Sequence, residues 1–574
     1  MNLPAIYHKT LDNYCYQFDN NSIIINLITG YDVDKVFIRI GDPFAFTNIN
    51  GKRIWVHKKY AIESSYTLKF NKIWSIKISP PYRRCCYFFE IYCGNENILL
   101  LDNGIFYKEE IIKYNYELQK FSFGFLNSID VNFPPKWVNN TIWYEIFIDG
   151  FCNSIESKNN ISKNQLFGGD INGIITKLDY IYSLGINGIY LTPINKSNSI
   201  HKYDTIDYFE IDESLGDKLI VKKLINEAHK RNIKVMFDAV FNHCSSECEL
   251  WKDVKSKGFN SKYINWFMVN EWPFNDNHRN SVTKKFYTYA FLDDMPKLNT
   301  NNQEVIDYLL DICEYWINEY DIDAIRLDAS DELSHKCIQQ IRNRTKQIKN
   351  DFFILGENWH NSIAWLRGNQ LDSVTNYPMQ KSILDFWINQ TISADEFSYM
   401  INSYYSRYME QTNEVLFNIV DSHDTQRLIT SLKSVDKFYQ VVTFLFTMTG
   451  SPCIYYGTEI LLEGINPDES RKYMPWNMIE KGQYADSISI IQLIIKLRKK
   501  YCSLKSGKII FLPYPNNKRI VSYKKFSKES EEEIEIILNC SNEAIKVKDI
   551  SKNILFSRLY EEDILNSNGI IIMK

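Results

Sequence analysis

The stretch DIDAIRLD, residues 321–328, ends in a charged pair and gives the first indication of the fold. Side chains of a β-strand alternate between two faces, so Ala324, Arg326 and Asp328 would share one face and the aliphatic residues between them the other. The charged pair of this strand is therefore expected to point inward.

Seven further apolar runs alternate with helical patterns on either side of this stretch. They are TIWYEIFI (141–148), INGIYLTPI (186–194), IKVMFDAV (233–240), FFILGE (352–357), DSVTNY (372–377), VLFNIV (415–420) and SPCIYYG (451–457). Eight strand and helix alternations predict a (β/α)8 TIM barrel, whose active site lies at the C-terminal ends of its strands. The long spacing after the third run predicts an irregular insertion at about residues 243–300, beside the active site.

The two ends of the chain have a different pattern from the centre. Short β-like runs such as SIIINLI (22–28) and DKVFIRI (34–40), separated by turn residues, predict an N-terminal β-sandwich. Short strands return after about residue 503, where KESEEEIEI (528–536) suits an exposed hairpin of a small all-β domain. The sequence thus predicts a multidomain α/β protein with domains at 1–125, 126–502 and 503–574.

Composition excludes several classes of protein. The 574 residues are 45% hydrophobic and 24% charged with a net charge of -4, which is typical of globular domains and shows no nucleic-acid footprint. The longest apolar stretch, residues 441–457, is interrupted by polar residues and falls short of the roughly 20 needed to cross a membrane. We expect no nucleic-acid partner and no membrane anchor.

The cysteines and the N-terminus predict a cytoplasmic protein. The start, MNLPAIYHKT, lacks the pattern of a secretory signal, and twelve scattered cysteines without a CxxC pair suggest reduced thiols. Cys244 and Cys248 lie near His243, but without a matching second group of ligands they are a weak indication of a metal site. No metal site is therefore predicted.

Two acidic residues at predicted strand ends are candidates for catalysis. A guanidinium beside a carboxylate favours the ionised form, so Arg326 is expected to lower the pKa of Asp328, as a nucleophile requires. A half-buried acid such as Glu357 would have a raised pKa that suits a proton donor. The alternatives are a structural ion pair for Arg326 and Asp328 and a helix N-cap region for Glu357.

Further polar residues end other predicted strands. The third run leads to Asp238 and His243, and the seventh leads to His423 and Asp424. Two carboxyl groups with sugar-binding donors and acceptors around them are what glycoside hydrolysis requires. Aromatic residues make up 15% of the chain, and some near predicted strand ends offer flat surfaces for sugars, although each alone is more often a core residue: Tyr144, Tyr203, Trp359 and Tyr377.

Four ordered segments resemble the signature regions of the alpha-amylase superfamily of glycoside hydrolases: DAVFNH (238–243), AIRLDASDE (324–332), GENWH (356–360) and VDSHDTQR (420–427). MPKLN (295–299) resembles the additional signature of its cyclomaltodextrinase, maltogenic amylase and neopullulanase branch. Further similar segments extend from the N-terminal part, PPYRRCCYFFE (80–90), to FGGDINGIITKLDYI (167–181), HKYDTIDYFEID (201–212) and SPCIYYGTE (451–459).

The resemblance implies a role for each matching residue. Asp328 would be the nucleophile, Glu357 the acid/base, and Asp424 the third carboxylate that grips the sugar hydroxyls. Further residues would contact the sugar at the cleavage point and the sugars on either side of it. The predicted set of substrate contacts is Tyr144, His201, Tyr203, Asp238, His243, Arg326, Glu332, Trp359, His423, Asp468 and Arg471. Within this set, Asp468 and Arg471 would bind the non-reducing side, and Glu332 and Trp359 the leaving-group side.

The same resemblance implies a retaining hydrolase of cyclomaltodextrins, pullulan and maltooligosaccharides, cleaving alpha-1,4 bonds with some alpha-1,6 cleavage and transglycosylation. It also implies a homodimer formed through the carbohydrate-binding-like N-terminal domain. Two alternatives remain: a glucosyl-transferring or isomerising member of the superfamily, and an inactive binding relative that kept the barrel.

Several positions depart from the family pattern. Ile148 and Gly150 replace a Pro and an Arg, and Asn358 stands where a small apolar residue is common. The loop CNSIESKNN (152–160) lacks the closely spaced acids of a calcium site and leaves only Asn153 and Asp170 as remnants, with Asp170 beyond the loop. No cofactor is expected to be required, and a calcium ion is doubtful.

Overall fold

The computed structural model describes residues 1–107, 119–154, 166–275, 279–514, 517–527, 530–547 and 553–574. The chain forms two compact units. The first comprises Met1–Phe133, Leu366–Asn369 and Ile392–Asn413, and the second comprises Pro134–Trp365, Gln370–Thr391 and Glu414–Lys574.

The first unit is an antiparallel β domain, as predicted for the N-terminus. Its main sheet has the order β1-β2-β7-β6-β3-β8-β9-β10, with β11 paired to β8. In β3 every second residue is buried, so Val36, Ile38 and Ile40 face the core. The strands are β1 (Cys15–Gln17), β2 (Ile23–Thr29), β3 (Lys35–Gly41), β6 (Lys58–Thr67), β7 (Lys72–Ile78), β8 (Cys85–Cys93), β9 (Glu96–Leu101), β10 (Gly104–Tyr107) and β11 (Phe121–Phe123), with a separate hairpin of β4 (Phe46–Ile49) and β5 (Lys52–Trp55). Helices α11 (Ala394–Tyr405) and α12 (Glu410–Asn413) also belong to this unit.

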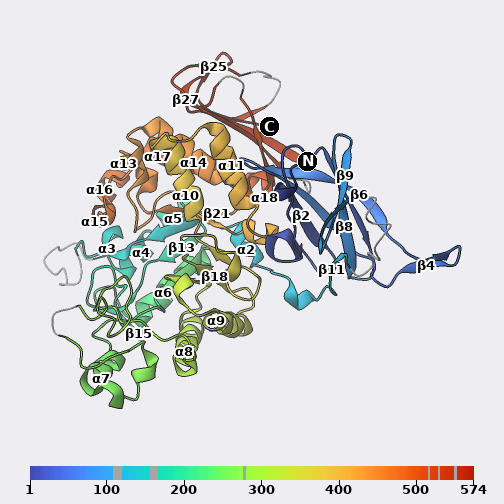
Figure 1. The fold of residues 1–574 in the computed structure, drawn as a ribbon. Helices are drawn as coiled ribbons and strands as arrows, with labels where there is room; N and C mark the ends of the chain where they lie inside the picture. Colours follow the sequence, from blue (N-terminus) through green and yellow to red (C-terminus); the bar gives the residue numbers. More distant parts are fainter. Residues whose placement is uncertain (108–118, 155–165, 276–278, 515–516, 528–529, 548–552) are drawn as a thin grey trace. The chain divides into compact units, whose positions relative to one another are not determined.

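The second unit contains the predicted barrel (Figure 1). Eight parallel strands have the order β19-β18-β17-β16-β13-β12-β21-β20, and a bridge between Thr375 and Phe417 closes the ring. Each predicted run contains one of them: β12 (Trp143–Ile146), β13 (Gly188–Leu191), β16 (Lys234–Ala239), β17 (Ala324–Leu327), β18 (Phe353–Gly356), β19 (Ser373–Val374), β20 (Phe417–Asn418) and β21 (Ser451–Tyr455). The predicted fold class is confirmed.

The barrel interior is packed with alternate residues of these strands, among them Trp143, Tyr190, Met236, Ala324 and Phe353. This apolar layer forms the floor beneath the polar residues at the strand ends. The larger helices of the barrel are α6 (Lys218–Lys230), α8 (Gln303–Tyr320), α9 (His335–Ile348), α14 (Val435–Thr447) and α17 (Ala485–Lys500). Helices α8 and α9 lie side by side (Figure 1).

The insertion after β16 is more ordered than the sequence indicated. It contains helix α7 (Glu249–Lys257) and its own aromatic core, in which Trp251 packs against Phe267, Phe274 and Phe286. Isolated β-bridges pair residues within the insertion, and one of them pairs His243, which follows β16, with Lys297.

The C-terminal part forms an antiparallel sheet of order β22-β23-β24-β27-β25, with β26 paired to β27. The strands are β22 (Lys508–Leu512), β23 (Ile520–Ser527), β24 (Glu532–Asn539), β25 (Ile545–Lys546), β26 (Ile554–Glu561) and β27 (Ile564–Met573). The predicted charged hairpin is formed by β23 and β24, although residues 528–529 lie outside the described part. Within the described ranges, no helix combines the length and apolar character needed to cross a membrane.

Candidate active site

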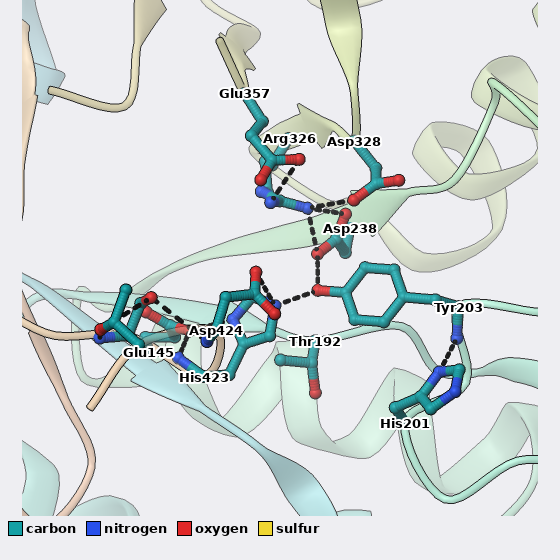
Figure 2. Close-up of polar contacts among 12 residues, drawn as sticks. Glu145, Thr192, His201, Tyr203, Asp238, Arg326, Asp328, Glu357, His423 and Asp424 are labelled. Carbon is teal, nitrogen blue, oxygen red and sulfur yellow. Dashed lines mark hydrogen bonds and ion pairs between the residues drawn. The ribbon is translucent and has the colours of Figure 1, made fainter. Parts of the chain in front are cut away.

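Three adjacent strands bring one arginine and three carboxylates together at the C-terminal mouth of the barrel (Figure 2). Arg326 Nη1 donates to both oxygens of Asp238 and to Asp328 Oδ1, each at 2.9 Å. Its Nη2 lies 2.9 Å from Glu357 Oε2. The charged pair of β17 therefore points inward, as predicted, on the same face as Ala324 of the barrel interior.

The net pKa of the nucleophile candidate, Asp328, differs from the expectation. Burial, and then the charge of Glu357, raise the pKa of Asp328 well above its usual range, although Arg326 opposes both. The prediction that Arg326 keeps Asp328 ionised is wrong: Arg326 does lower the pKa, but burial and the charge of Glu357 outweigh it. Asp328 therefore retains its proton to higher pH than an isolated carboxyl would.

Asp238 links this cluster to two tyrosines. Tyr190 and Tyr203 donate their hydroxyl hydrogens to Asp238 Oδ2 at 2.5 and 2.9 Å. Burial raises the pKa of Asp238 even though Arg326 lies beside it. Asp238 is thus fully engaged by the protein, and its visible role is to hold Arg326 and Tyr203 in place.

The other oxygen of Glu357 faces an aromatic pair. Trp359 Nε1 donates to Glu357 Oε1 at 3.2 Å, and the Tyr377 hydroxyl lies 3.4 Å from the same atom. The rings of Trp359 and Tyr377 stack at 3.6 Å with an interplanar angle of 8°. Ala329 N donates to Glu357 Oε2 at 3.0 Å, so that the acid is fixed from the β17 side as well.

A second charged group lies on the other side of the mouth, where β20 leads into His423 and Asp424 (Figure 2). His423 Nε2 lies 2.9 Å from Asp424 Oδ2 and 2.6 Å from the Tyr203 hydroxyl, whose ring stacks on the imidazole. Burial disfavours the imidazolium, but Asp424 and Glu145 outweigh it and raise the pKa of His423 to about 10. Burial likewise opposes ionisation of Asp424, yet His423 lowers the pKa of Asp424 below its usual range.

Arg471 approaches this second group from the loop after β21. Its Nη2 lies 3.7 Å from Asp424 Oδ1, and its Nε donates to the His423 carbonyl at 3.3 Å. Asp468 pairs with Arg471 at 3.6 Å, with its side chain 95% exposed. Arg471 therefore lies beside Asp424, and Asp468 lies at the exposed edge of this group.

The remaining predicted histidines line the insertion side of the mouth. His243 Nε2 faces the Tyr203 carbonyl at 3.2 Å, its ring stacks on Tyr289, and burial lowers the pKa of His243 to about 3. His201 Nδ1 accepts the backbone N–H of Tyr203 at 3.1 Å, and burial lowers the pKa of His201. Both rings are therefore neutral near pH 7.

Glu332 is held at the rim by the insertion. Lys297, from the segment MPKLN, lies 3.0 Å from Glu332 Oε2 and also contacts the side chain of Asn242. The structure thus joins that segment to the end of β16 and to the turn after β17.

Tyr144 is the one predicted substrate contact that the structure does not bring to the cluster. Its side chain is fully buried and its hydroxyl donates to Glu459 Oε1 at 2.7 Å, on the outer face of β12. Trp143 and Glu145 take the inward positions because side chains alternate along the strand. The prediction had the correct strand and the wrong face.

Sequence reasoning missed four residues that the structure places at the cluster: Glu145, Tyr190, Tyr289 and Lys297. An acid inside the apolar run TIWYEIFI must find a partner when buried, which was an available indication for Glu145. Tyr289 and Lys297 reach the mouth only through the path of the insertion, which no local pattern predicts.

Asp170, one of the two possible remnants of a calcium site, makes hydrogen bonds with both carboxylate oxygens. Asp170 Oδ1 accepts the N–H of Gly173 at 2.6 Å, and Oδ2 accepts the hydroxyl and N–H of Ser154 at 2.7 and 3.2 Å. Asp170 therefore acts as the N-cap of α4 (Ile171–Thr176). Most of the loop after Asn153 lies outside the described residues, and no group of three or more His, Cys, Asp or Glu able to hold a metal occurs within them.

Comparisons with known proteins agree with this geometry. Residues 145–493 match the family model "Alpha amylase, catalytic domain", and residues 1–125 match "Alpha amylase, N-terminal ig-like domain". The chain is 38% identical to a cyclomaltodextrinase of Geobacillus thermopakistaniensis (strain MAS1) over 559 residues, covering 95% of this chain and 92% of that protein. It is 38% identical to an intracellular maltogenic amylase of Bacillus subtilis, covering 87% and 85%. A solved cyclomaltodextrinase structure covers 100% of both chains at a TM-score of 0.89 and 32% identity.

Proposed function

This chain belongs to the alpha-amylase family of glycoside hydrolases, and from that premise we propose that it opens cyclomaltodextrins and cleaves pullulan and maltooligosaccharides with retention of configuration. The observation that carries the proposal is the bridge by Arg326 between Asp328 and Glu357, both at 2.9 Å. One guanidinium that contacts both acids keeps them close together, as a retaining mechanism requires.

We assign Asp328 as the nucleophile and Glu357 as the general acid/base. In the first step Glu357 gives its proton to the glycosidic oxygen while an Asp328 oxygen forms a bond to the anomeric carbon and the leaving sugar departs. In the second step the ionised Glu357 takes a proton from water, the water oxygen bonds to the anomeric carbon, and Asp328 is released. Because burial and the neighbouring carboxylates raise the pKa of Asp328 in the free enzyme, this mechanism requires Asp328 to give up its proton when substrate binds, so that it can attack as a carboxylate.

The other predicted residues would hold the sugar. Asp424 and His423 would bind hydroxyls at the cleavage point, Arg471 would extend this grip to the non-reducing side, and Glu332 would face the leaving sugar. The stacked pair of Trp359 and Tyr377 supports this arrangement, because Trp359 is 55% exposed and offers a flat apolar face beside the acid/base. A sugar on that face could replace water in the second step, which gives transglycosylation.

The preference for small glucans is supported by the relatives named cyclomaltodextrinase and maltogenic amylase. We also propose a cytoplasmic location, for which the relative named intracellular gives support, and no required cofactor.

We further propose a homodimer formed through the N-terminal unit. Its support is the hairpin of β4 and β5 with its flanking residues, where large apolar side chains are exposed: Phe44 before β4 at 73%, Ile49 at 51%, Ile54 at 41% and Val56 after β5 at 48%. Sedimentation of the full chain should give twice the monomer mass, and a Phe44→Asp variant should shift toward monomer. A wild-type chain that stays monomeric at micromolar concentration would remove this part of the proposal.

The decisive experiment is a product time course on β-cyclodextrin, pullulan and soluble starch, with added glucose in a parallel set. We expect rapid opening of cyclodextrin to maltose, slow attack on starch, and longer transfer products with glucose. Products formed only by transfer would favour the glucosyl-transferring alternative. No release from any substrate would favour the binding relative.

A further inference from the structure

Glu145 has no predicted role, yet it lies at the centre of the second charged group. It projects inward from β12, is 1% exposed, and accepts two hydrogen bonds from one residue. The backbone N–H of His423 donates to Glu145 Oε1 at 3.1 Å, and the ring Nδ1 contacts the same oxygen (Figure 2). Glu145 therefore fixes both the backbone and the ring of His423.

The opposite ring nitrogen faces a second carboxylate, Asp424 Oδ2, at 2.9 Å. An ionised carboxylate can only accept hydrogen bonds, so both Nδ1 and Nε2 of His423 must carry hydrogens to satisfy Glu145 and Asp424. A ring with two N–H groups is an imidazolium. The Tyr203 hydroxyl lies 2.6 Å from Nε2 and donates its own hydrogen to Asp238 at 2.9 Å. Every donor in this series of hydrogen bonds therefore has an acceptor.

Other charged groups face His423 from the surrounding elements. Asp238 on β16 favours the charged ring, whereas Arg471 on the loop after α15 (Pro467–Ser470) and Arg326 on β17 disfavour it. Around Glu145 itself the titratable neighbours include Asp421, Cys453, Tyr455, Tyr190 and Tyr377, all buried. The two carboxylates in direct contact outweigh the cations, because Arg471 approaches only the His423 carbonyl and Asp424, and Arg326 pairs with Asp238, Asp328 and Glu357.

We propose that Glu145 is a positioning residue that keeps His423 in its positively charged, doubly protonated form, with Nε2 turned toward Asp424 and the sugar. The proposal rests on the proposed function only for its effect on catalysis. The charged ring donates a hydrogen bond to Asp424 and helps to keep that carboxylate ionised, in the state that accepts hydrogen bonds from sugar hydroxyls.

The test compares wild-type protein with Glu145→Gln. The amide has the shape of the acid and can still accept one hydrogen bond, but it has no charge and cannot require a second hydrogen on the ring. In the wild type, His423 should stay protonated up to about pH 10. In Glu145→Gln it should lose its proton at least one pH unit lower, so that the neutral fraction at pH 8 rises roughly tenfold or more.

The direct readout is the NMR titration of the His423 ring in protein labelled at histidine, with His423→Gln to assign the resonance. This measurement needs no activity, so its outcome is independent of the proposed function. If the ring titrates at the same pH in both proteins, or near pH 6.5 in the wild type, the inference is wrong.

The second readout is the alkaline limb of kcat/KM on β-cyclodextrin. Loss of the single proton on Glu357 should give a limb of slope near -1 in the wild type, whereas Glu145→Gln should approach -2 because His423 also deprotonates. Glu459→Gln is the matched control, since Glu459 is a fully buried acid that accepts from Tyr144 and Tyr180 and does not contact His423. Its slope should stay at the wild-type value, and a merely structural role for Glu145 would leave the slope unchanged as well.

Discussion

Arg326 and Arg498 are both buried arginines of the second unit, 3% and 1% exposed, but they differ in their partners. Arg326 contacts three carboxylates at the mouth of the barrel. Arg498, near the end of α17, donates to the carbonyls of Phe446, Met448 and Leu504 at 2.7 to 2.9 Å and also contacts the carbonyl of Gly450.

The difference separates two uses of a buried charge. Carbonyl groups have fixed dipoles and do not titrate, so Arg498 joins the end of α14, the segment before β21 and the end of α18 (Cys502–Ser506) at any pH. Carboxylates titrate and repel one another, so the group around Arg326 stores unfavourable charge that substrate binding can use. Stability is thus expected to depend on Arg498 and catalysis on Arg326.

The largest expected effect comes from removing one of the carboxylates that pair with Arg326. Asp328→Asn should lower kcat/KM on β-cyclodextrin by roughly 10^4-fold or more, because no nucleophile remains. The melting temperature should stay the same or rise, since one of three crowded carboxyls is gone. Initial rates and calorimetry on the same preparation check both halves. Activity near the wild-type level would contradict the assignment of Asp328, and a large drop in melting temperature would contradict the comparison.

The converse substitution is Arg498→Met, which leaves four buried carbonyls without their donor. We expect the free energy of unfolding to fall by roughly 3 to 5 kcal/mol, with kcat per folded molecule close to that of the wild type. Urea unfolding measures the first quantity and active-site titration the second. Lys496→Met, an exposed position on the same helix, is the control and should change stability by less than about 0.5 kcal/mol. Equal effects of the two variants would show that the carbonyl contacts contribute little.

Histidines extend the same comparison to a titratable cation. His423 lies between two carboxylates and has a raised pKa, whereas the ring nitrogens of His8 in the first unit face the neutral Asn26 carbonyl and Tyr87 hydroxyl. Burial lowers the pKa of His8 to about 4. Since the unfolded chain binds a proton near pH 6.5 and the folded chain does not, stability is fully present above pH 6.5 and declines as the pH falls toward 4.

The expected loss from His8 is about 3 kcal/mol between pH 6.5 and pH 4. His8→Gln, which retains a donor but cannot titrate, should remove this slope from the unfolding of the first unit. Denaturant unfolding at pH 4, 5, 6 and 7, followed by a probe in that unit, is the measurement. A wild-type curve that is flat over this range, or a variant that keeps the slope, would show that His8 is not the responsible group.

The sequence predicted the site only where strand order and the alternation of side chains decide the position of a residue. Parallel strands bring their C-terminal ends to one edge, so Asp238, Asp328, Glu357 and Asp424 could be placed together from strand order and alternation alone. Tyr144 could not be placed correctly, because large apolar or aromatic residues occupy both faces of its run beside Glu145 and the neighbouring strands decide which face points inward.

The prediction of a lowered pKa for Asp328 was wrong for a related reason. One strand shows Arg326 beside Asp328, but the two further carboxylates that share the guanidinium come from β16 and β18 and are far away in the sequence. The aromatic core of the insertion, built by Trp251 and three phenylalanines, also depends on long-range contacts. Local patterns thus predicted the carboxylates at the strand ends but neither the contributions of the insertion nor the balance of charge at the site.

The smallest expected effect has the opposite sign to that of Arg498→Met and concerns its neighbour Lys525. This lysine on β23 is fully buried, and its Nζ donates to Thr449 Oγ1 and the Gly507 carbonyl, each at 2.5 Å. Burial, and then Arg498, lower the pKa of Lys525 well below its usual range. An amine that is difficult to protonate costs stability at any pH where the unfolded chain is protonated.

Lys525→Met should therefore raise the free energy of unfolding at pH 7 by about 1 kcal/mol, after the loss of two hydrogen bonds is included. The gain should shrink toward pH 10, because the unfolded lysine then approaches its own pKa and no longer favours unfolding. Urea unfolding at pH 7, 8.5 and 10 tests the sign and the slope together. A variant that is less stable at pH 7 would mean that the two hydrogen bonds outweigh the cost of burial, and that carbonyl and hydroxyl partners hold a lysine here as effectively as carbonyls hold Arg498.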